Sequence, residues 1–197
     1  MKQTVKIIGG KYRGKNISFL DAKDLRPTPN RVKETLFNWL MHDIQGARCL
    51  DAFAGSGALG FEALSRGAAE VTFIDASPAT CALLKQNASA LSGASGWAVH
   101  CMNTLTHLKQ VKLPYQIIFL DPPFSSDLLS RSLTLLETTT CLTEKGLIYI
   151  ESEHEVHVNS NYWFKRQHKK AGQVHYALYE KRLDKEASSC FNHPVPL

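Results

Sequence analysis

A glycine-rich segment in the first half of the chain has the spacing of a nucleotide-binding loop. Gly55, Gly57 and Gly60 match the pattern G-x-G-x-x-G, directly after one apolar run and before a helix-like one. Glycine permits the tight turn and lets a ligand approach the backbone closely. Asp75 follows Gly55 by twenty residues, at the end of the next expected strand, where a carboxylate can accept hydrogen bonds from ribose hydroxyls. This combination predicts a site for a nucleotide-like cofactor.

An acidic residue ahead of the glycines indicates which cofactor the loop would hold. Asp51 lies four residues before Gly55. A dinucleotide places its pyrophosphate against the helix N-terminus, where a nearby carboxylate would repel it. A carboxylate instead suits a cationic ligand, and S-adenosylmethionine carries a sulfonium and an amino group. The sequence therefore favours S-adenosylmethionine over NAD. We expect Asn103, after the third strand of this region, to reach the adenine of that cofactor.

The segment Asp121-Pro122-Pro123-Phe124 supplies groups for chemistry on a nucleobase amine. The two prolines fix the backbone, so the carboxylate and the adjoining carbonyls are held at the carboxyl edge of the sheet. An exocyclic amine is a poor nucleophile because its lone pair is delocalised into the ring. Acceptors that bind its hydrogens orient that lone pair toward a methyl group, and Asp121 can help to remove the proton. Phe124 offers a face for base stacking. A proline turn with a capping acid is the structural alternative.

The spacing of apolar residues predicts the elements that must position these groups. From Arg48 onward, strand-like and helix-like segments alternate, and several strands are continuous apolar runs, which indicates a parallel, doubly wound α/β sheet covered on both faces. Two alternating segments near the end predict an antiparallel hairpin. The expected strands are 48–53, 71–75, 97–102, 115–121 and 146–151, followed by 162–168 and 173–181; the expected helices are 58–65, 78–91, 105–109 and 127–139.

The N-terminal region is expected to form a small basic extension of this sheet. Residues 6–15 predict a short strand that breaks into a glycine-rich turn, and residues 16–20 predict the return strand. A helix is expected over residues 30–43, with one apolar face made by Val32, Leu36, Leu40, Met41 and Ile44. We therefore divide the chain into residues 1–45 (basic hairpin and helix), 46–183 (the domain that carries the glycine loop) and 184–197 (a loose tail).

Composition excludes several classes of protein. The chain has 197 residues, of which 44% are hydrophobic and 21% charged, as in soluble globular proteins, and not in chains disordered throughout. It contains no apolar run of transmembrane length, and no apolar stretch follows the first charges as in a secretory signal. Five cysteines without a C-x-x-C pair indicate reduced thiols and a cytoplasmic protein. His154 and His157 lack metal-binding helical spacing, so no metal is expected.

The charge is distributed unevenly along the chain. The net charge is +7 over residues 1–33, −6 over residues 34–164 and +4 over residues 165–197. Clustered Lys and Arg side chains neutralise phosphates and release counterions, so basic ends suit a polyanion that docks against both termini. A solvated basic surface without a partner is the alternative.

Three further segments accompany the glycine loop and the Asp-Pro-Pro-Phe sequence. They are Ile8-Gly9-Gly10 with Arg13-Gly14, the run from Leu25 to Asn38, and Ala171-Gly172-Gln173-Val174 with Tyr176, Leu178 and Tyr179. Together, over residues 7–182, the chain resembles the RsmD family of bacterial 16S rRNA guanine-N2 methyltransferases. The glycine loop is common to many methyltransferases, whereas the N-terminal segment is much more specific.

The resemblance implies a class I methyltransferase (Rossmann-like) fold with a mostly parallel seven-stranded sheet. It implies methyl transfer from S-adenosylmethionine to the exocyclic N2 amine of a guanine in 16S rRNA, within the small ribosomal subunit or an assembly intermediate. We expect a monomer. The resemblance and the motifs together give cofactor contacts at Asp51, Phe53, Ala54, Gly55, Gly57, Asp75, Ala76, Asn103 and Asp121, a catalytic pocket at Asp121, Pro122, Pro123 and Phe124, and RNA contacts at Lys11, Arg13, Lys15, Arg26, Arg31 and Lys169.

Three other functions remain open from the residues alone. A methyltransferase acting on adenine or cytosine amines of DNA or another RNA would use the same Asp-Pro-Pro-Phe sequence. An NAD-dependent oxidoreductase would use the same glycine pattern, although Asp51 disfavours it. An RNA-binding or assembly protein could retain the fold without catalysis.

Overall fold

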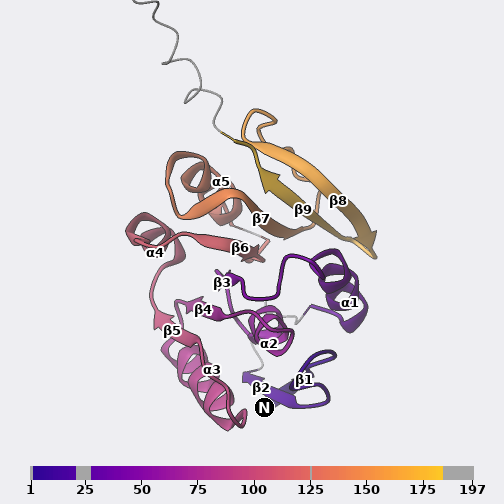
Figure 1. The fold of residues 1–197 in the computed structure, drawn as a ribbon, viewed down its shortest axis with the longest axis vertical. Coiled ribbons are helices and arrows are strands. Elements are labelled where there is room, and N and C mark those ends of the chain that lie inside the picture. Colours follow the sequence, from indigo (N-terminus) through magenta and orange to yellow (C-terminus); the bar gives the residue numbers. More distant parts are fainter. Residues whose placement is uncertain (1, 21–27, 125, 184–197) are drawn as a thin grey trace, which may run out of the picture.

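The computed structural model describes residues 2–20, 28–124 and 126–183. Its centre is a seven-stranded sheet in the order β5-β4-β3-β6-β7-β9-β8 (Figure 1). The first five strands in this order are parallel, and β9 runs antiparallel to both of its neighbours. The strands are β3 (Arg48–Asp51), β4 (Glu70–Asp75), β5 (Trp97–Cys101), β6 (Tyr115–Leu120), β7 (Leu142–Ser152), β8 (Trp163–Ala171) and β9 (Val174–Lys181). The predicted fold class is confirmed.

Helices connect the parallel strands and cover both faces of the sheet, as continuous apolar strands require. They are α1 (Asn30–Trp39), α2 (Ala58–Ser65), α3 (Pro78–Ala90), α4 (Thr104–Gln110) and α5 (Leu128–Thr138). Figure 1 shows α4 and α5 on one side of the sheet, and α1 and α2 on the other. No helix in the described part of the chain is long and apolar enough to span a membrane.

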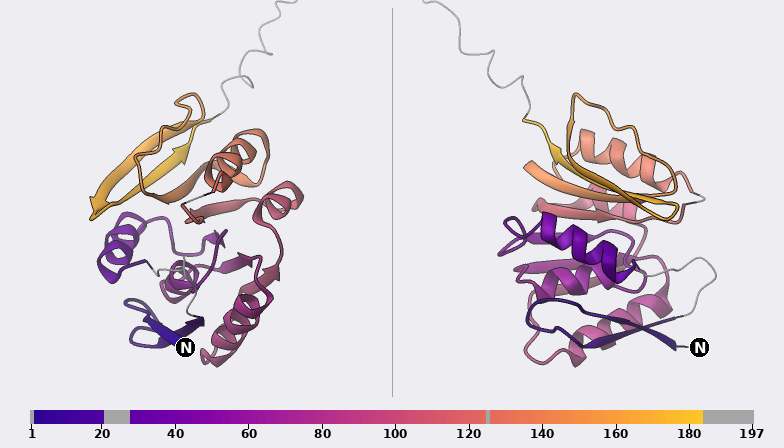
Figure 2. Two further views of the ribbon diagram at one scale, coloured as in Figure 1. Left: turned by 180° about the vertical axis from the view of Figure 1, so that it is seen from behind. Right: turned by 90° about the vertical axis from the view of Figure 1, so that its right-hand side faces the viewer.

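The N-terminal hairpin packs into the same core as the sheet. It consists of β1 (Lys2–Lys6) and β2 (Asn16–Leu20), paired antiparallel. Figure 2, right, shows the hairpin and α1 next to each other along one side of the sheet. Lys33 on α1 is buried, and its Nζ donates to the Lys6 carbonyl at 2.7 Å. The core shared by the hairpin, α1, α2 and the sheet includes Val5, Ile17, Phe19, Leu36, Phe37, Phe61 and Phe119.

Several predicted boundaries were wrong, for local reasons. The first strand was expected to begin near residue 6 but spans residues 2–6. The residues after it form the turn, in which Gly10 and Gly14 adopt φ angles of +72° and +86°. Helix α1 ends at Trp39 and not near residue 43, so Met41 is 62% exposed and leaves the expected apolar face. Strands β3, β5 and β6 end one or two residues earlier than expected, and β7 begins at Leu142 instead of residue 146.

The strand order indicates that the carboxyl ends of the parallel strands form the ligand-binding edge of the sheet. Strand β3 pairs with β4 on one side and with β6 on the other, so the connections that follow β3 and β6 diverge to opposite sides. Open α/β sheets bind ligands at the carboxyl ends of their strands, next to such a reversal in strand order. The glycine loop, Asp75 and the Asp-Pro-Pro-Phe loop all follow the carboxyl ends of β3, β4 and β6.

Candidate active site

The glycine loop connects β3 to α2 in a tight, backbone-bonded turn. Gly57 is the N-cap of α2 with φ +75°, a conformation that favours glycine. A Cβ on Gly57 would lie 2.6 Å from a ring carbon of Phe61, so the position has no room for a side chain. The Ala54 N–H donates to the Ile74 carbonyl at 2.8 Å, which attaches the loop to the end of β4. The loop backbone is therefore fixed before a ligand binds.

Asp75 holds this loop from the end of β4. Its Oδ2 accepts the Gly55 N–H at 3.0 Å, and its Oδ1 accepts the Ser77 N–H at 2.8 Å. Each carboxylate oxygen can accept a second hydrogen bond. Asp75 can therefore position the loop and still accept the ribose hydroxyls that the sequence assigns to it.

Asp51 lies beneath the glycine loop and bonds the first turn of α2. The side chain is buried at 3% exposure, and its Oδ2 accepts the Gly60 N–H at 2.9 Å. Gly57, the N-cap residue, has no side chain that could cap α2. The Asp51 carboxylate instead accepts one of the backbone N–H groups left unpaired in the first turn of α2, that of Gly60. Burial, with smaller contributions from the charges of Asp75 and Glu151, raises the pKa of Asp51 from 3.8 to about 7, while the Gly60 bond opposes the rise.

Replacing Asp51 by Asn is expected to stabilise the protein at pH 8 and to weaken cofactor binding. The raised pKa means that the folded state loses stability through this carboxyl as the pH rises from about 4 to 7, a cost of the order of 4 kcal/mol above pH 7. Asn cannot ionise, but its oxygen can still accept the Gly60 N–H. Urea unfolding at pH 5 and pH 8 should therefore show a smaller loss of stability in the variant. An identical pH dependence in both proteins would refute this assignment.

The Asp-Pro-Pro-Phe loop is rigid, and its two ends are differently exposed. Asp121 is half-buried directly after β6. Its pKa is raised well above the ordinary value by burial and by the nearby charges of Glu151 and Asp51. The Pro123 carbonyl accepts both the N–H and the hydroxyl of Ser126, at 3.1 and 2.6 Å, so its two lone pairs hold the turn. Phe124 is 43% exposed, which leaves its ring available to a stacking partner.

Sequence reasoning missed a second fully buried carboxyl at this edge, besides Asp51. Glu151, near the end of β7, is 4% exposed, and its Oε1 accepts hydrogen bonds from Tyr149 Oη and Thr28 Oγ1, both at 2.9 Å. Glu151 ends the apolar run 147–150 just as Asp121 ends the apolar run of β6. That shared pattern, an acid directly after an apolar strand, is the signal that could have found it.

The chemistry of this donor set fits a cationic cofactor. Asp51, Asp121 and Glu151 follow one another across β3, β6 and β7, and in the described residues none of them forms an ion pair with a basic side chain. Adjacent buried carboxyls repel one another and become easier to ionise when a cation binds nearby. S-adenosylmethionine carries positive charge on its sulfonium and amino groups, and Asp75 would supply acceptors for its ribose.

The remaining predicted cofactor contacts lie at the same edge with different exposures. Asn103 is exposed, and its Oδ1 accepts the Thr106 N–H at 3.2 Å as the N-cap of α4. Ala54 is buried in the glycine loop and Phe53 is half-buried beside it, whereas Ala76 is exposed directly after β4. A helix cap thus accounts for the oxygen of Asn103, and its contact with adenine stays a prediction.

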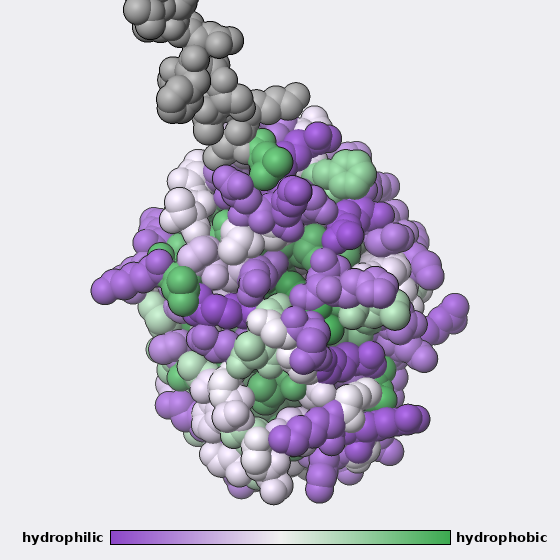
Figure 3. Space-filling model, viewed as in Figure 1, coloured by the Kyte–Doolittle hydropathy of each residue, from purple (hydrophilic) through white to green (hydrophobic). Residues whose placement is uncertain are grey.

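The predicted RNA contacts do not form one cluster. Lys11, Arg13 and Lys15 are exposed on the hairpin turn, while Lys169 is exposed on β8, the last strand in the order of the seven-stranded sheet. Hydrophilic side chains project over the hairpin at the lower right of Figure 3. Arg31 is exposed in the first turn of α1. Arg26 lies outside the described residues.

The hairpin turn is attached to the far end of α2 from the glycine loop. Ile8 N–H donates to the buried Glu62 at 2.9 Å, and Tyr12 N–H donates to Ser65 Oγ at 2.9 Å. Between the hairpin and α1 runs a groove of about 470 Å³, which joins the turn to the beginning of α1. The groove is lined by Lys6, Ile7, Ile8, Arg13, Gly14, Asn30, Glu34 and Arg66.

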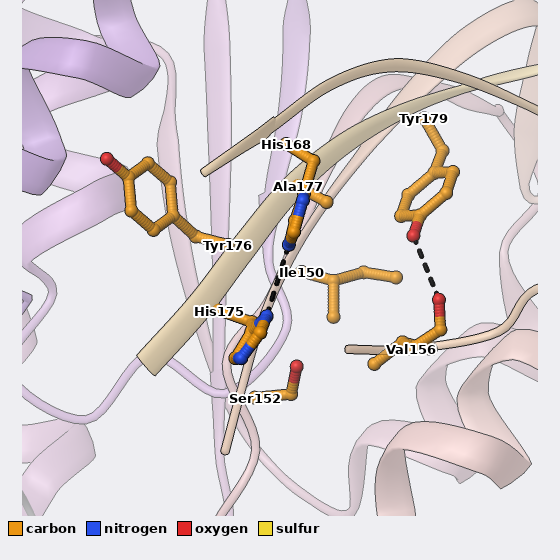
Figure 4. Close-up of a pocket in the computed structure, with 8 residues that line it drawn as sticks. All are labelled: Ile150, Ser152, Val156, His168, His175, Tyr176, Ala177 and Tyr179. Atoms are coloured by element: carbon orange, nitrogen blue, oxygen red, sulfur yellow. Dashed lines mark hydrogen bonds between the residues drawn. The ribbon is translucent and has the colours of Figure 1, made fainter. Parts of the chain in front are cut away.

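Two histidines of the C-terminal hairpin lie against each other in a small crevice between β7, β8 and β9. His168 Nε2 and His175 Nδ1 are 3.2 Å apart, with the rings stacked (Figure 4). Nearby, Tyr179 Oη donates to the Val156 carbonyl at 3.1 Å. Burial, with the charge of Lys170 next, lowers the pKa of His175. In the described part of the chain, no group of three or more potential ligands is arranged to hold a metal ion.

The fold and the position of this edge define a class of protein. A doubly wound sheet with the order β5-β4-β3-β6-β7-β9-β8 and a glycine loop after β3 is the class I methyltransferase fold. Magnesium protoporphyrin IX methyltransferase from Synechocystis PCC 6803, solved with bound S-adenosylmethionine, shares the fold alone, with a TM-score of 0.60 and 13% identity over 77% of this chain and 78% of that one.

Sequence relatives narrow the class to a family. The family model "Conserved hypothetical protein 95" matches residues 5–180. The ribosomal RNA small subunit methyltransferase D of Escherichia coli (strain K12) is 44% identical over 188 residues, which cover 94% of each chain. A solved Escherichia coli methyltransferase structure has a TM-score of 0.81 and 45% identity, covering 91% of this chain and 99% of that one. The chain belongs to the ribosomal RNA small subunit methyltransferase D family, and the predicted resemblance is confirmed.

Proposed function

We propose that this protein transfers a methyl group from S-adenosylmethionine to the exocyclic N2 amine of a guanine in small-subunit (16S) ribosomal RNA. The observation that carries the proposal is the carboxyl edge of the sheet, where Asp121 follows β6 beside the glycine loop that follows β3. The family relationship supports RNA of the small subunit as the substrate. In this proposal the protein is a monomer in the cytoplasm, and its substrate is the small ribosomal subunit or an assembly intermediate of that subunit.

The chain's own residues would orient and deprotonate the target amine. S-adenosylmethionine, when bound, supplies the electrophilic methyl group on its sulfonium. The Asp121 carboxylate would accept a hydrogen bond from the guanine amine and so turn the lone pair of the amine nitrogen away from the ring system. The same carboxylate would take up the proton that this nitrogen loses when it is methylated. The raised pKa of Asp121 makes its carboxylate a stronger base than an ordinary one.

The rest of the pocket would bind the guanine base and restrict the motion of the Asp121 carboxylate. Pro122 and Pro123 restrict the backbone, and the Ser126 bonds to the Pro123 carbonyl close the turn behind it. The exposed ring of Phe124 would stack on the guanine, which must leave its own stack to reach the enzyme. Stacking on an aromatic side chain contributes about 1–3 kcal/mol per base.

The groove between the hairpin and α1 suggests how the RNA would approach this edge. Its lining contains three cations, Lys6, Arg13 and Arg66, against one acid, Glu34. Arg66 is held by Glu62 at 2.7 Å, so its position is set before RNA binds. The groove reaches Asn30, the first residue of α1, close to Thr28 and hence to the catalytic edge.

Reversing the charge of Arg13 is expected to weaken RNA binding and to leave cofactor affinity unchanged. The Arg13→Glu variant removes one phosphate contact and adds a repulsive charge, so the salt dependence of RNA affinity should decrease by about 0.7–0.9 in log–log slope. Binding is measured by titration at several salt concentrations, with Lys109→Glu on α4, on the other side of the sheet, as the control. Equal weakening by both variants would contradict a specific contact.

A comparison of substrates tests the proposed function against the alternative functions. Labelled S-adenosylmethionine is incubated with the protein and with small ribosomal particles, naked 16S rRNA or DNA. The account expects label on the ribosomal substrates and none on DNA. Label on DNA alone would indicate an adenine or cytosine methyltransferase, and tighter binding of NAD than of S-adenosylmethionine would indicate an oxidoreductase.

A further inference from the structure

Glu151 joins two parts of the candidate site that are far apart in the sequence. Its Oε1 accepts the hydroxyl of Tyr149, two residues earlier on β7, and the hydroxyl of Thr28, 123 residues away. A buried carboxyl is costly unless hydrogen bonds compensate for its lost hydration. Two hydroxyl donors on one oxygen indicate that this carboxyl is held in a defined position.

On one side, Glu151 is the neighbour of Asp121. Leu120 on β6 pairs with Ile150 on β7 in parallel register, so the next residues of the two chains are Asp121 and Glu151. Phe119 and Tyr149 pair two residues earlier, with ring centroids 6.4 Å apart, which places their side chains on one face of the sheet. Side chains two residues apart on a strand share a face, so Asp121 and Glu151 follow on this face too.

On the other side, Glu151 holds the beginning of α1. Thr28 is buried, and Pro29 and then Asn30, the first residue of the helix, follow it. Because Pro29 restricts the backbone, a bond at Thr28 also fixes the direction in which α1 begins. Arg31 and Asn30, which we place on the path of the RNA, lie within three residues of that bond.

We propose that Glu151 is a positioning residue for methyl transfer: it fixes the RNA-contacting start of α1 at the catalytic edge and keeps a negative charge beside Asp121. This inference rests on the proposed function and assigns a residue to it. Burial raises the pKa of Glu151, while the hydroxyls of Tyr149 and Thr28 oppose the rise by stabilising its ionised form. The charge of that ionised form keeps Asp121 a strong proton acceptor, and the Thr28 bond aligns the RNA with that acceptor. Among the described residues, the titratable groups around the pair are Asp51 on β3, Tyr149 on β7 and Tyr176, which pairs with Glu151 from β9.

Glu151→Gln tests the effect of the charge, because the amide oxygen can still accept both hydroxyls. Removing a negative neighbour lowers the pKa of Asp121, so the acidic limb of the kcat profile should move to lower pH. The weaker base should lower kcat at pH 8 by about tenfold, with S-adenosylmethionine affinity unchanged. An unchanged pH profile, or a loss of kcat matched by a loss of cofactor affinity, would overturn the inference.

Thr28 variants test the link to the RNA-contacting segment. Thr28→Val keeps the shape but removes one hydrogen bond, and should raise the KM for small ribosomal particles by about 2- to 12-fold, with a smaller change in kcat. Thr28→Ser restores the hydroxyl and should return KM close to the wild-type value. Thr35→Val is the matched control, because the Thr35 hydroxyl bonds only the Arg31 carbonyl within α1. A normal KM in Thr28→Val, or no rescue by serine, would overturn the link.

A measurement without substrate separates this inference from the proposed function. Carbon-13 NMR of labelled aspartate carboxyls follows the titration of Asp121, assigned with the Asp121→Asn variant. The inference requires this titration to move to lower pH in Glu151→Gln, whichever substrate the enzyme methylates. An identical titration in both proteins would overturn it, whereas absence of methyl transfer to ribosomal particles by the wild type would overturn only the proposed function.

Discussion

Asp121→Ala is expected to abolish most methyl transfer and to leave the protein folded and able to bind S-adenosylmethionine. The substitution removes the only side-chain carboxylate of the Asp-Pro-Pro-Phe loop, and with it the proposed hydrogen-bond acceptor for the amine and the proposed proton acceptor. Loss of a positioned base costs about 10² to 10⁴ in rate. The prolines and the Ser126 bonds that shape the loop are untouched, so the fold should persist.

Single-turnover methyl transfer and cofactor titration measure the two effects separately. Asp121→Asn serves as the matched variant, because it keeps the shape and one acceptor oxygen but cannot take up a proton. We expect Asn to lose nearly as much turnover as Ala if proton removal is the principal role. Wild-type turnover in either variant would contradict the assignment, and a parallel loss of thermal stability would indicate misfolding instead.

Gly57→Ala is expected to destabilise the protein and to disrupt the cofactor loop. Gly57 has φ +75°, and an added Cβ would lie 2.6 Å from Phe61 and 2.7 Å from Leu84. The left-handed backbone costs an ordinary residue about 1–2 kcal/mol, and overpacking of the core costs about 1–3 kcal/mol more. The unfolding free energy should therefore fall by about 2–5 kcal/mol, with weaker S-adenosylmethionine binding.

Gly46 supplies a control that separates backbone strain from steric overlap. It has the same φ of +75°, but an added Cβ would meet no atom within 4 Å. Gly46→Ala should lose only the backbone contribution, about 1–2 kcal/mol, and should bind the cofactor normally. Both variants are compared by urea unfolding and by cofactor titration. Equal losses in both would mean that the contacts of Gly57 with Phe61 and Leu84 carry no weight.

The order of elements and most of the acidic edge could be predicted from the sequence. The spacing from the glycine motif predicted Asp51 and Asp75, and the apolar run that ends in Asp-Pro-Pro-Phe predicted Asp121 at the carboxyl end of a parallel strand. The glycine spacing predicted the loop. Glycine is needed at position 57 because a side chain there would overlap Phe61 and Leu84. Such signals are local, so they survive in a single sequence.

Other features depend on contacts between distant segments. The bond between Thr28 and Glu151 spans 123 residues, and no local pattern indicates it. Asp51 was expected to act on a ligand through its charge, but its bond to Gly60 depends on how α2 begins. The early end of α1 similarly exposes Met41 although its spacing fits the apolar face. Tertiary packing decides these points, and propensity and periodicity describe only single elements.

The most direct test maps the methyl group that this protein adds. Small ribosomal particles from cells that lack the protein are incubated with it and with S-adenosylmethionine labelled in the methyl group, and the RNA is digested and analysed by mass spectrometry. We expect one labelled nucleoside, a guanosine methylated on its exocyclic N2 amine, and no label with Asp121→Ala. Label on a ring nitrogen, on another base or on ribose, or no label with cofactor binding intact, would contradict the central claim.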